Sequence, residues 1–374
     1  MSQKPQPPKR SPKARAPRAK SSRRETVSVG RRLGRGLLGA FVTLVIVGVV
    51  ALLGAAWIYN GPGPAAKTGD KTTVILRKGA SLPEIASSLE RGGVIRSSSI
   101  FMTAAKVTGA ARGLKAGEYE FKSRASMAAI LDAIRHGRIV RHWITIPEGL
   151  TSDMVMDILN KSDVLTGDAA TPPEGAILPE TYEVQRGEDR AAVLQRMMDD
   201  RDKVLNQLWA NRQQGLPYRS KEEAVTMASI VEKETGKAGE RPQVAAVFIN
   251  RLRTGMRLDT DPTVIYGISR GRPLGRGLRR SELDTPTPYN TYKIDGLPPT
   301  PIANPGRAAL EAALNPAKTN DLYFVADGTG GHVFASTLEQ HNANVAKWRQ
   351  IERGRAAGVP VVPAPPAAKP LAGG

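Results

Sequence analysis

Two glutamates separated by one residue, Glu232 and Glu234, follow the largely apolar stretch Met227-Ala-Ser-Ile-Val. If this stretch is helical, Glu232 shares a face with Ala228 and Val225, one and two turns earlier. A carboxyl group on such a buried face is desolvated, and the negative end of the helix dipole acts in the same direction, so its pKa should rise. A carboxylic acid that keeps its proton near neutral pH can protonate the leaving oxygen of a glycosidic bond.

The spacing alone also fits a solvated helix end, where two carboxylates would do no chemistry. Glu234 points to another face, with Ile230 and Met227 behind it, and could orient Arg251 or a loop amide. The spacing does not decide between Glu232 and Glu234.

Other catalytic chemistries find little support in the sequence. The chain has no cysteine and only four histidines, none of them beside a G-x-S-x-G turn. His332 and His341 are nine residues apart, which is not a metal-ligand spacing on a helix. Walker A and dinucleotide-binding glycine patterns are also missing from the sequence. We therefore predict no metal and no cofactor, and surface or local hydrogen-bonding roles for the histidines.

The two glutamates lie in a region where helices and loops alternate. We expect helices over 187–216, 221–234, 240–254 and 337–354, a loop-rich stretch over 258–300, and a hairpin over 322–334. Gly236 and Gly255 stand where glycines commonly follow helix ends.

An earlier segment has an internal repeat. Residues 74–81 match residues 144–151, each with a β-rich run, a glycine and a final hydroxyl residue, and Leu89 matches Leu159. A strand, a glycine turn, a hydroxyl cap and an amphipathic helix would form one unit used twice. Residues 73–122 predict the order strand, helix, helix, strand, which resembles LysM-type glycan-binding modules; a structural spacer is the alternative.

The first sixty residues predict a membrane anchor. Residues 1–36 contain twelve Lys and Arg against the single acid Glu25, and residues 37–59 carry no charge. About 20 apolar residues span a bilayer as a helix, and Trp57 and Tyr59 suit the far interface. The basic flank places the N-terminus in the cytoplasm and the rest of the chain outside the plasma (inner) membrane.

Two alternatives to an anchor remain. The apolar region of a cleaved signal peptide is shorter, about 7–15 residues, although Gly54-Ala-Ala56 could be cut. A buried core helix would not be so uniformly apolar beside so basic a flank.

The charge distribution argues against a nucleic-acid binder. The tail over 1–36 carries eleven of the nineteen net positive charges, and it has no aromatic residue. We expect that tail and residues 355–374 to be disordered, and residues 60–72 to be a linker that lifts the exported part off the membrane.

Longer motifs surround the glutamates. They are Ala228-Ser-Ile-Val-Glu-Lys-Glu-Thr235, Val247-Phe-Ile-Asn-Arg-Leu252, Met256-Arg-Leu-Asp-Thr-Asp-Pro-Thr-Val-Ile-Tyr-Gly267, Thr287-Pro-Tyr-Asn-Thr-Tyr292, Gly296-Leu-Pro-Pro299, Tyr323-Phe-Val-Ala-Asp-Gly328 and Gly331-His-Val-Phe334. Together they resemble the endolytic murein transglycosylases of the YceG/MltG family, over roughly residues 30–350. Residues 174–182 depart from the family pattern, since Ala176 and Leu178 stand where it has aromatic rings.

The resemblance implies a lytic transglycosylase. These enzymes cut the bond between N-acetylmuramic acid and N-acetylglucosamine without water, because the muramyl 6-hydroxyl attacks its own anomeric carbon and leaves a 1,6-anhydro end. Most glycosidases need two carboxylates, but here the tethered nucleophile supplies an effective concentration on the order of 10⁵ M or more. By the family match, Glu232 is expected to donate a proton to the leaving oxygen and then to take one from the 6-hydroxyl.

Further residues of these motifs are candidates for support or for sugar binding, through amide and phenol groups or through ring stacking. They are Glu234, Asn250, Arg251, Tyr266, Tyr289, Asn290 and Tyr292. Core packing is the alternative role of the tyrosines.

The predicted fold class is α+β. It comprises the transmembrane helix over 37–59, a LysM-like βααβ module over 73–142 and a mixed α+β catalytic domain over 143–354. The expected partners are peptidoglycan glycan strands and membrane-embedded cell-wall synthases, and no nucleic acid. The tether should favour nascent strands, whose elongation cleavage would end; a non-catalytic, glycan-binding scaffold is the runner-up.

Overall fold

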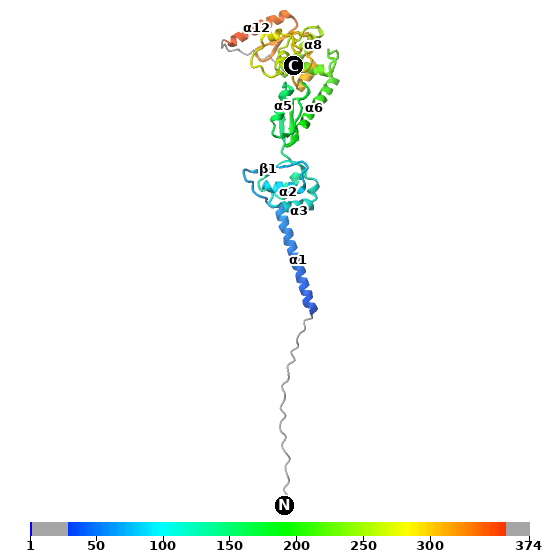
Figure 1. Ribbon diagram of the computed structural model, residues 1–374, viewed down its shortest axis with the longest axis vertical. Coiled ribbons are helices and arrows are strands. Elements are labelled where there is room, and N and C mark those ends of the chain that lie inside the picture. The colour runs from blue at the N-terminus through cyan, green and yellow to red at the C-terminus, as the bar shows by residue number, and fades with distance from the viewer. Residues whose placement is uncertain (2–28, 357–374) are drawn as a thin grey trace, which may run out of the picture.

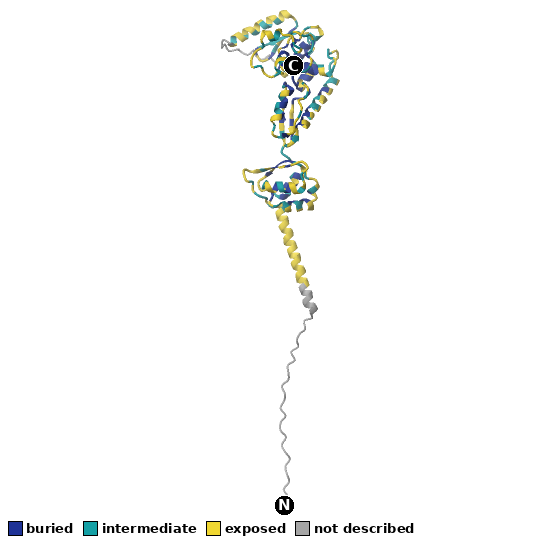
Figure 2. Cartoon of the chain, viewed as in Figure 1, coloured by how far each residue is buried: buried dark blue, intermediate teal, exposed yellow. Residues whose placement is uncertain are grey.

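The computed structural model describes Met1 and residues 29–356, so residues 2–28 and 357–374 of the two predicted tails lie outside the described residues. The other residues of these tails were expected to be disordered, but 29–36 form the start of a helix and 355–356 form the end of another. Figure 1 shows a long helix, α1 (Val29–Asn60), followed by a small module and then by a larger C-terminal part. Figure 2 shows that α1 is exposed along nearly all of its described length, whereas the two parts that follow have buried interiors.

The predicted apolar helix is present in α1. Residues Leu37–Asn60 have a mean hydropathy of 2.7, and this helix is long and apolar enough to cross a membrane. None of this stretch is buried by the rest of the described protein.

The small module has the predicted order of strand, helix, helix and strand. Its elements are β1 (Lys71–Leu76), α2 (Leu82–Arg91), α3 (Ser98–Val107), the short 3-10 turn η1 (Ala110–Arg112), β2 (Gly117–Lys122) and a further helix, α4 (Met127–His136). β1 pairs antiparallel with β2, with Val74 opposite Tyr119. Alternate strand residues and one face of each helix form a single hydrophobic cluster, in which Phe101 and Tyr119 are the largest fully buried side chains.

The segment predicted as a linker over 60–72 is hydrogen-bonded to this module. Gly63 N donates to Arg124 O at 3.1 Å, and Arg124 N donates to Pro64 O at 3.0 Å. Ala66 N donates to Ser123 Oγ at 3.1 Å, and Tyr59 at the end of α1 packs on the module's core. The glycine and proline content suggested flexibility, but backbone hydrogen bonds to residues 123–124 fix the segment. The module therefore begins directly at the end of α1.

The internal repeat predicted from the sequence is confirmed in three dimensions. The second copy consists of β3 (His142–Thr145) and α5 (Ser152–Lys161), matching β1 and α2. Gly79 and Gly149 both adopt positive φ angles, 80° and 74°, which glycine tolerates best. Leu89 and Leu159 are both fully buried.

The second copy starts a different hydrophobic cluster. β3 pairs antiparallel with β5 (Thr181–Val184), and the two-residue strands β4 (Leu165–Thr166) and β6 (Glu188–Asp189) pair in parallel. The long helix α6 (Arg190–Ala210) contributes the fully buried Val193 and Met197 to the same cluster as these two small sheets.

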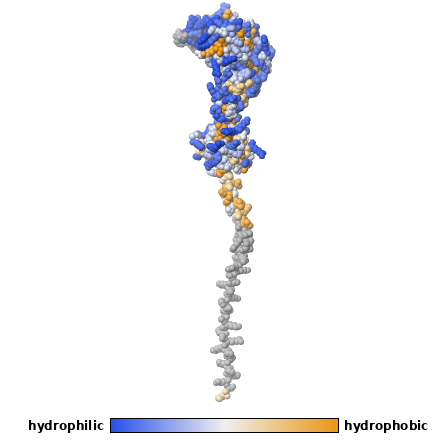
Figure 3. Space-filling model, viewed as in Figure 1, coloured by the Kyte–Doolittle hydropathy of each residue, from blue (hydrophilic) through white to orange (hydrophobic). Residues whose placement is uncertain are grey.

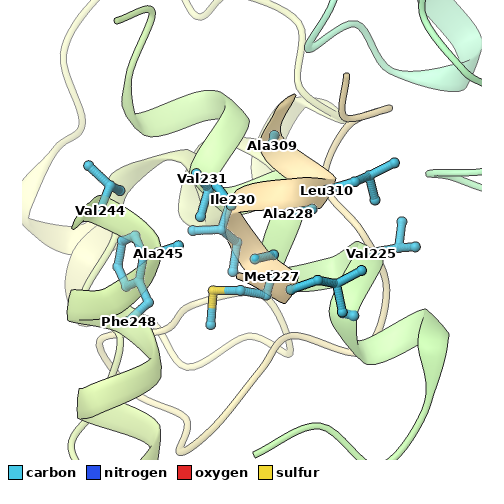
Figure 4. Packing of buried hydrophobic residues seen from close by; sticks show 14 of the residues in the cluster. Val225, Met227, Ala228, Ile230, Val231, Val244, Ala245, Phe248, Ala309 and Leu310 are labelled. Atoms are coloured by element: carbon cyan, nitrogen blue, oxygen red, sulfur yellow. The ribbon is translucent and has the colours of Figure 1, made fainter. Parts of the chain in front are cut away.

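The largest cluster surrounds three helices, α7 (Lys221–Glu234), α8 (Arg241–Arg253) and α11 (Arg307–Leu314). Figure 4 shows α7 side chains such as Ile230 and Met227 between Phe248 of α8 and Leu310 of α11. The predicted hairpin forms from β7 (Tyr323–Ala326) and β8 (His332–Ala335), and α12 (Leu338–Ala356) follows it. The described part is thus a mixed α+β structure with one N-terminal apolar helix.

The stretch 258–300 is loop-rich, as expected, but it also contains two helices that were not predicted, α9 (Asp261–Ser269) and α10 (Arg280–Asp284). Pro262 lies in the first turn of α9, where its missing N–H has no partner to lose. Gly236 was expected where glycines commonly follow helix ends, but it does not adopt the left-handed conformation, because the cap residue Thr235 is already extended.

The departure at 174–182 has a packing explanation. Ala176 and Leu178 are both buried, and Leu178 belongs to the cluster around α7. Side chains at these two positions fill the core here and face no solvent-filled groove.

Candidate active site

Helix α7 presents both glutamates. Ser220 caps its start by accepting a hydrogen bond from Glu223 N at 3.2 Å, and Glu222 and Glu223 suit the positive end of the dipole. Every residue from Ala224 to Val231 is buried, so the helix is surrounded by protein. Its last turn therefore delivers both glutamates into structured surroundings and not into bulk solvent, and the burial predicted for Glu232 is present.

Both carboxylate oxygens of Glu232 are bound by other groups of the protein. One carboxylate oxygen accepts from Arg241 Nη2 at 3.0 Å, and the other accepts from the backbone N–H of Gly306 at 3.0 Å. Its side chain is 5% exposed, and Arg241 also binds Glu148 at 3.1 Å. Burial raises the pKa of Glu232; the Gly306 amide and Arg241 oppose the rise, and Glu148 adds to it.

Glu234 lines a pocket of about 520 Å³ between α7, α8, α9 and the C-terminal hairpin. Its carboxylate accepts a hydrogen bond from the Thr260 hydroxyl. Burial raises the pKa of Glu234, and the nearby Asp261 carboxylate adds to the rise, whereas the Thr260 hydroxyl and the charges of His332 and Arg251 oppose it. The carboxyl group therefore tends to keep its proton while it faces a space that a ligand can enter.

The same pocket brings together two other predicted residues. Arg251 Nε donates to Leu322 O at 2.7 Å, and its guanidinium lies 5.3 Å from the centre of the Tyr323 ring. The Tyr292 hydroxyl donates to Asp261 Oδ1 at 2.8 Å. The pocket is therefore lined by polar and charged groups of Glu234, Arg251 and Tyr292, which can form hydrogen bonds with a sugar.

The remaining predicted residues lie elsewhere. Asn250 donates to the carbonyls of Thr319 and Asp321 at 2.9 and 3.0 Å, and it lines a different pocket. Asn290 is fully buried, and its amide donates to three backbone carbonyls at residues 282, 283 and 285. These two amides hold loops in place.

The other two tyrosines pack against each other. The rings of Tyr266 and Tyr289 are 5.0 Å apart. Tyr266 donates to Glu174 at 3.1 Å, and the Tyr289 hydroxyl is 2.8 Å from that of Thr300. Neither tyrosine lines the pocket of Glu234, so their position agrees with the core-packing alternative.

Several pocket residues were missed from the sequence. Asp259 and Asp261 flank Thr260 in the run Leu258-Asp-Thr-Asp261, and all four residues of this run line the pocket. Burial raises the pKa of Asp259, and its φ of 49° is unusual for a residue other than glycine. The sequence pattern of two acids around a hydroxyl residue, Asp259-Thr-Asp261, could have indicated that this run lies in the site.

The histidine prediction needs one amendment. His142 and His332 form local contacts with Glu118 and Glu240, at 2.7 and 2.9 Å. His341, however, lines the Glu234 pocket and stacks on Tyr323, with ring centres 5.1 Å apart. Burial and the charge of Arg251 lower the pKa of His341, so both favour the neutral imidazole in the pocket.

Comparisons with a family model and with curated proteins point to the same family. A family model described as the YceG-like family matches residues 74–347. An endolytic murein transglycosylase of Bacillus subtilis is 32% identical over 335 residues, covering 79% of this chain and 91% of that protein. An endolytic murein transglycosylase of Streptococcus pneumoniae is 28% identical, covering 83% of this chain but only 64% of its own length. The crystal structure of a YceG-like protein from Listeria monocytogenes is 30% identical, covers 74% of this chain and 99% of that one, and gives a TM-score of 0.47.

Proposed function

Because this chain belongs to the YceG-like family, we propose that it is a membrane-anchored endolytic lytic transglycosylase acting on nascent peptidoglycan. The relatives named as endolytic murein transglycosylases support a peptidoglycan transglycosylase. The product would carry a 1,6-anhydro-N-acetylmuramic acid end, and the cut would end the elongation of a strand.

The observation that carries the chemistry is the position of Glu234. Of the two carboxylates singled out, Glu234 lines a described pocket, whereas both oxygens of Glu232 are bound by Arg241 and Gly306. A proton donor must come within about 2.6–3.2 Å of the leaving oxygen. We therefore favour Glu234 as the donor, and we keep Glu232, expected from the family match, as the alternative that the experiment must separate.

The proposed reaction balances with a single carboxyl group. Protonated Glu234 donates its proton to the glycosidic oxygen as the bond from that oxygen to the muramyl anomeric carbon breaks. The muramyl 6-hydroxyl oxygen forms a new bond to the same carbon, and its proton passes to the Glu234 carboxylate. The enzyme returns to its starting state, and no water is consumed.

Neighbouring charges suit this transition state. Positive charge develops on the anomeric carbon and ring oxygen, and Asp259 and Asp261 line the same pocket. Arg251 partly offsets this acidity through its 3.7 Å ion pair with Asp259. These groups would stabilise the transition state through fixed electrostatics.

Glu232 would have a positioning role. Its ion pair with Arg241 joins α7 to α8, and its bond to Gly306 N joins α7 to the start of α11. It would thereby hold the end of α7, and hence Glu234, in place.

The location is part of the proposal. Helix α1 would span the plasma (inner) membrane once with the basic N-terminus in the cytoplasm, which puts the pocket on the side where glycan strands emerge. Cell-wall synthases in the same membrane would be partners. The small module has the strand, helix, helix, strand order of LysM-type modules, which supports a role in glycan contact.

Digestion of defined, uncrosslinked glycan strands followed by mass spectrometry tests this function. The wild-type chain should release fragments with anhydro ends. Products heavier by one water would show a hydrolase on the same site, and binding without new chain ends would show a scaffold. Glu234→Gln and Glu232→Gln, with the exposed α11 residue Glu311→Gln as control, assign the donor.

A further inference from the structure

We infer that helix α3 of the small module lies in the outer leaflet of the membrane that α1 spans, with lipid acyl chains in the groove between the two helices. The groove measures about 710 Å³. Its walls are the last turns of α1, from Ala51 to Tyr59, and α3 with its following turn, from Ser99 to Thr108. The inference rests on the membrane topology given under the proposed function.

Helix α3 is apolar on two sides. Phe101 and Ala105 face inward and are fully buried in the module's core. On the outer side, Ile100 is 38% exposed and Val107 is 82% exposed, and both line the groove together with Ala104. Residues spaced by four and then three positions lie on one face of a helix, so α3 presents an apolar stripe to the groove.

The depth of this stripe follows from the length of α1. The 24 residues of Leu37–Asn60 rise about 36 Å as a helix, against a hydrocarbon core of about 30 Å. The helix is thus about 6 Å longer than the hydrocarbon layer is thick. If this extra length is shared equally by the two ends, the hydrocarbon layer stops about 3 Å, or two helical residues, before Asn60. Residues 51–58 then lie within hydrocarbon, and α3 stands across the groove from them.

The module cannot easily lift away from this position. The bonds of Gly63 and Pro64 to Arg124, together with the packing of Tyr59 on the core, attach the module directly to α1. Residues Trp57 and Ile58 also face Ile130 of α4 across a second, small cavity. Figure 1 shows α3 at the end of the module nearest α1, and Figure 3 shows the described part of α1 as a hydrophobic surface that meets the module there.

Acyl chains are the occupant that this geometry favours. The groove is continuous with the surface of α1, which must contact lipid on every side that protein does not cover. A helix of another copy or of a partner could also fill an apolar groove; the test below detects either of them.

The absence of cysteine from the chain gives a clean test with single labelled cysteines. Val107→Cys and Ile100→Cys report on the stripe. Ile75→Cys on β1, 50% exposed and outside the groove, is the matched apolar control, and Leu44→Cys reports on α1. The full-length protein carries an environment-sensitive dye at each position, in phosphatidylcholine–phosphatidylglycerol vesicles with doxyl-labelled acyl chains as lipid quenchers and iodide as the aqueous quencher.

The expected result is quenching of the dyes at Val107 and Ile100 by doxyl lipids, with loss of iodide quenching and a blue-shifted emission. The dye at Ile75 should respond to iodide alone. Equal iodide quenching at Val107 and Ile75 would overturn the inference. Shielding of Val107 from both quenchers would show that protein covers the stripe, which also overturns it.

The α1 label separates this inference from the proposed topology. If the dye at Leu44 is quenched by doxyl lipids and that at Val107 is not, only the placement of α3 fails. If Leu44 also escapes lipid quenching, the membrane span itself is wrong. The cleavage assay on glycan strands is independent of both outcomes.

Discussion

Glu232 and Glu234 stand two residues apart on one helix, yet their surroundings differ in almost every respect. Two residues turn a helix by about 200°, so the side chains leave α7 on opposite sides. Glu232 meets a guanidinium and a backbone amide, which bind both of its oxygens. Glu234 meets a hydroxyl, further carboxylates and an open pocket. The first arrangement holds a fold together, and the second can perform acid–base chemistry.

The largest expected effect is on catalysis at Glu234. Glu234→Gln keeps the shape of the side chain but removes the transferable proton, so kcat/KM should fall by about 10²–10⁴-fold. The rate of formation of anhydro ends measures this. Glu311→Gln should cleave like the wild type, and a Glu234→Gln chain with normal activity would remove Glu234 from the mechanism.

The next effect is on stability at Glu232. Glu232→Gln leaves the buried Arg241 with only the half-exposed Glu148 as an ionic partner, which should cost about 3 kcal/mol of unfolding free energy. Denaturant unfolding of the detergent-solubilised chain measures the loss. The surviving folded enzyme should still form anhydro ends. A stable but inactive variant would instead restore Glu232 as the proton donor.

A pH series distinguishes Glu234 from a stabilising ion pair. Because burial raises the pKa of Glu234 in the fold, the unfolded chain releases this proton at a lower pH than the folded chain does. The wild type therefore loses stability as the pH rises from about 4.3, by at most about 1.4 kcal/mol per unit, until the folded-state pKa is passed.

The Glu234→Gln variant does not have this loss. Its unfolding free energy relative to the wild type should increase from pH 4 to pH 7, while the Glu311→Gln chain shows no such trend. Parallel curves for the wild type and Glu234→Gln would show that the fold does not perturb this carboxyl group.

A smaller effect is expected at the pocket wall. Tyr292→Phe removes a pocket hydroxyl that bonds to Asp261 and that a bound glycan could also contact. Loss of one hydrogen bond to the glycan, worth about 1 kcal/mol, should raise KM about fivefold. Tyr289→Phe is the matched control, because its hydroxyl meets Thr300 outside the pocket. Equal effects of the two changes would mean that the glycan does not lie against Tyr292.

The smallest effect concerns the repeated glycine. A Cβ atom at position 149 would lie 3.5 Å from the Cγ atom of Glu232, whereas a Cβ atom at position 79 would meet no atom within 4 Å. Both have positive φ, so Gly149→Ala and Gly79→Ala should each cost about 1 kcal/mol of stability. Cleavage by the folded fraction should be unchanged in both, as thermal unfolding and product counts can verify. A specific loss of activity in Gly149→Ala would link the Glu232 side to the chemistry.

The local patterns that the sequence predicted well are those set by neighbouring residues. Ser81 and Thr151 both precede helices, Gly79 and Gly149 both turn the chain, and the hairpin after Tyr323 forms as expected. The apolar length of α1 likewise follows from the sequence alone.

The failures arise where distant segments meet. The partner of Glu232, Gly306, lies 74 residues away, and the Glu234 pocket combines Asp259 with His341 from α12. Tertiary packing alone determines that Glu232 lies against Arg241 and that Glu234 lines a pocket. Asn290 was predicted at the cleft because its amide is polar, but three carbonyls close by in sequence bind it first.

A structure of the full-length Glu234→Gln variant with an uncrosslinked glycan strand bound would test the central claim most directly. We predict that the glycosidic oxygen between N-acetylmuramic acid and N-acetylglucosamine lies within hydrogen-bonding distance of the residue 234 side chain, in the pocket beside Tyr292. A strand seated against Glu232 and Glu148, with the Glu234 pocket empty, would contradict the assignment.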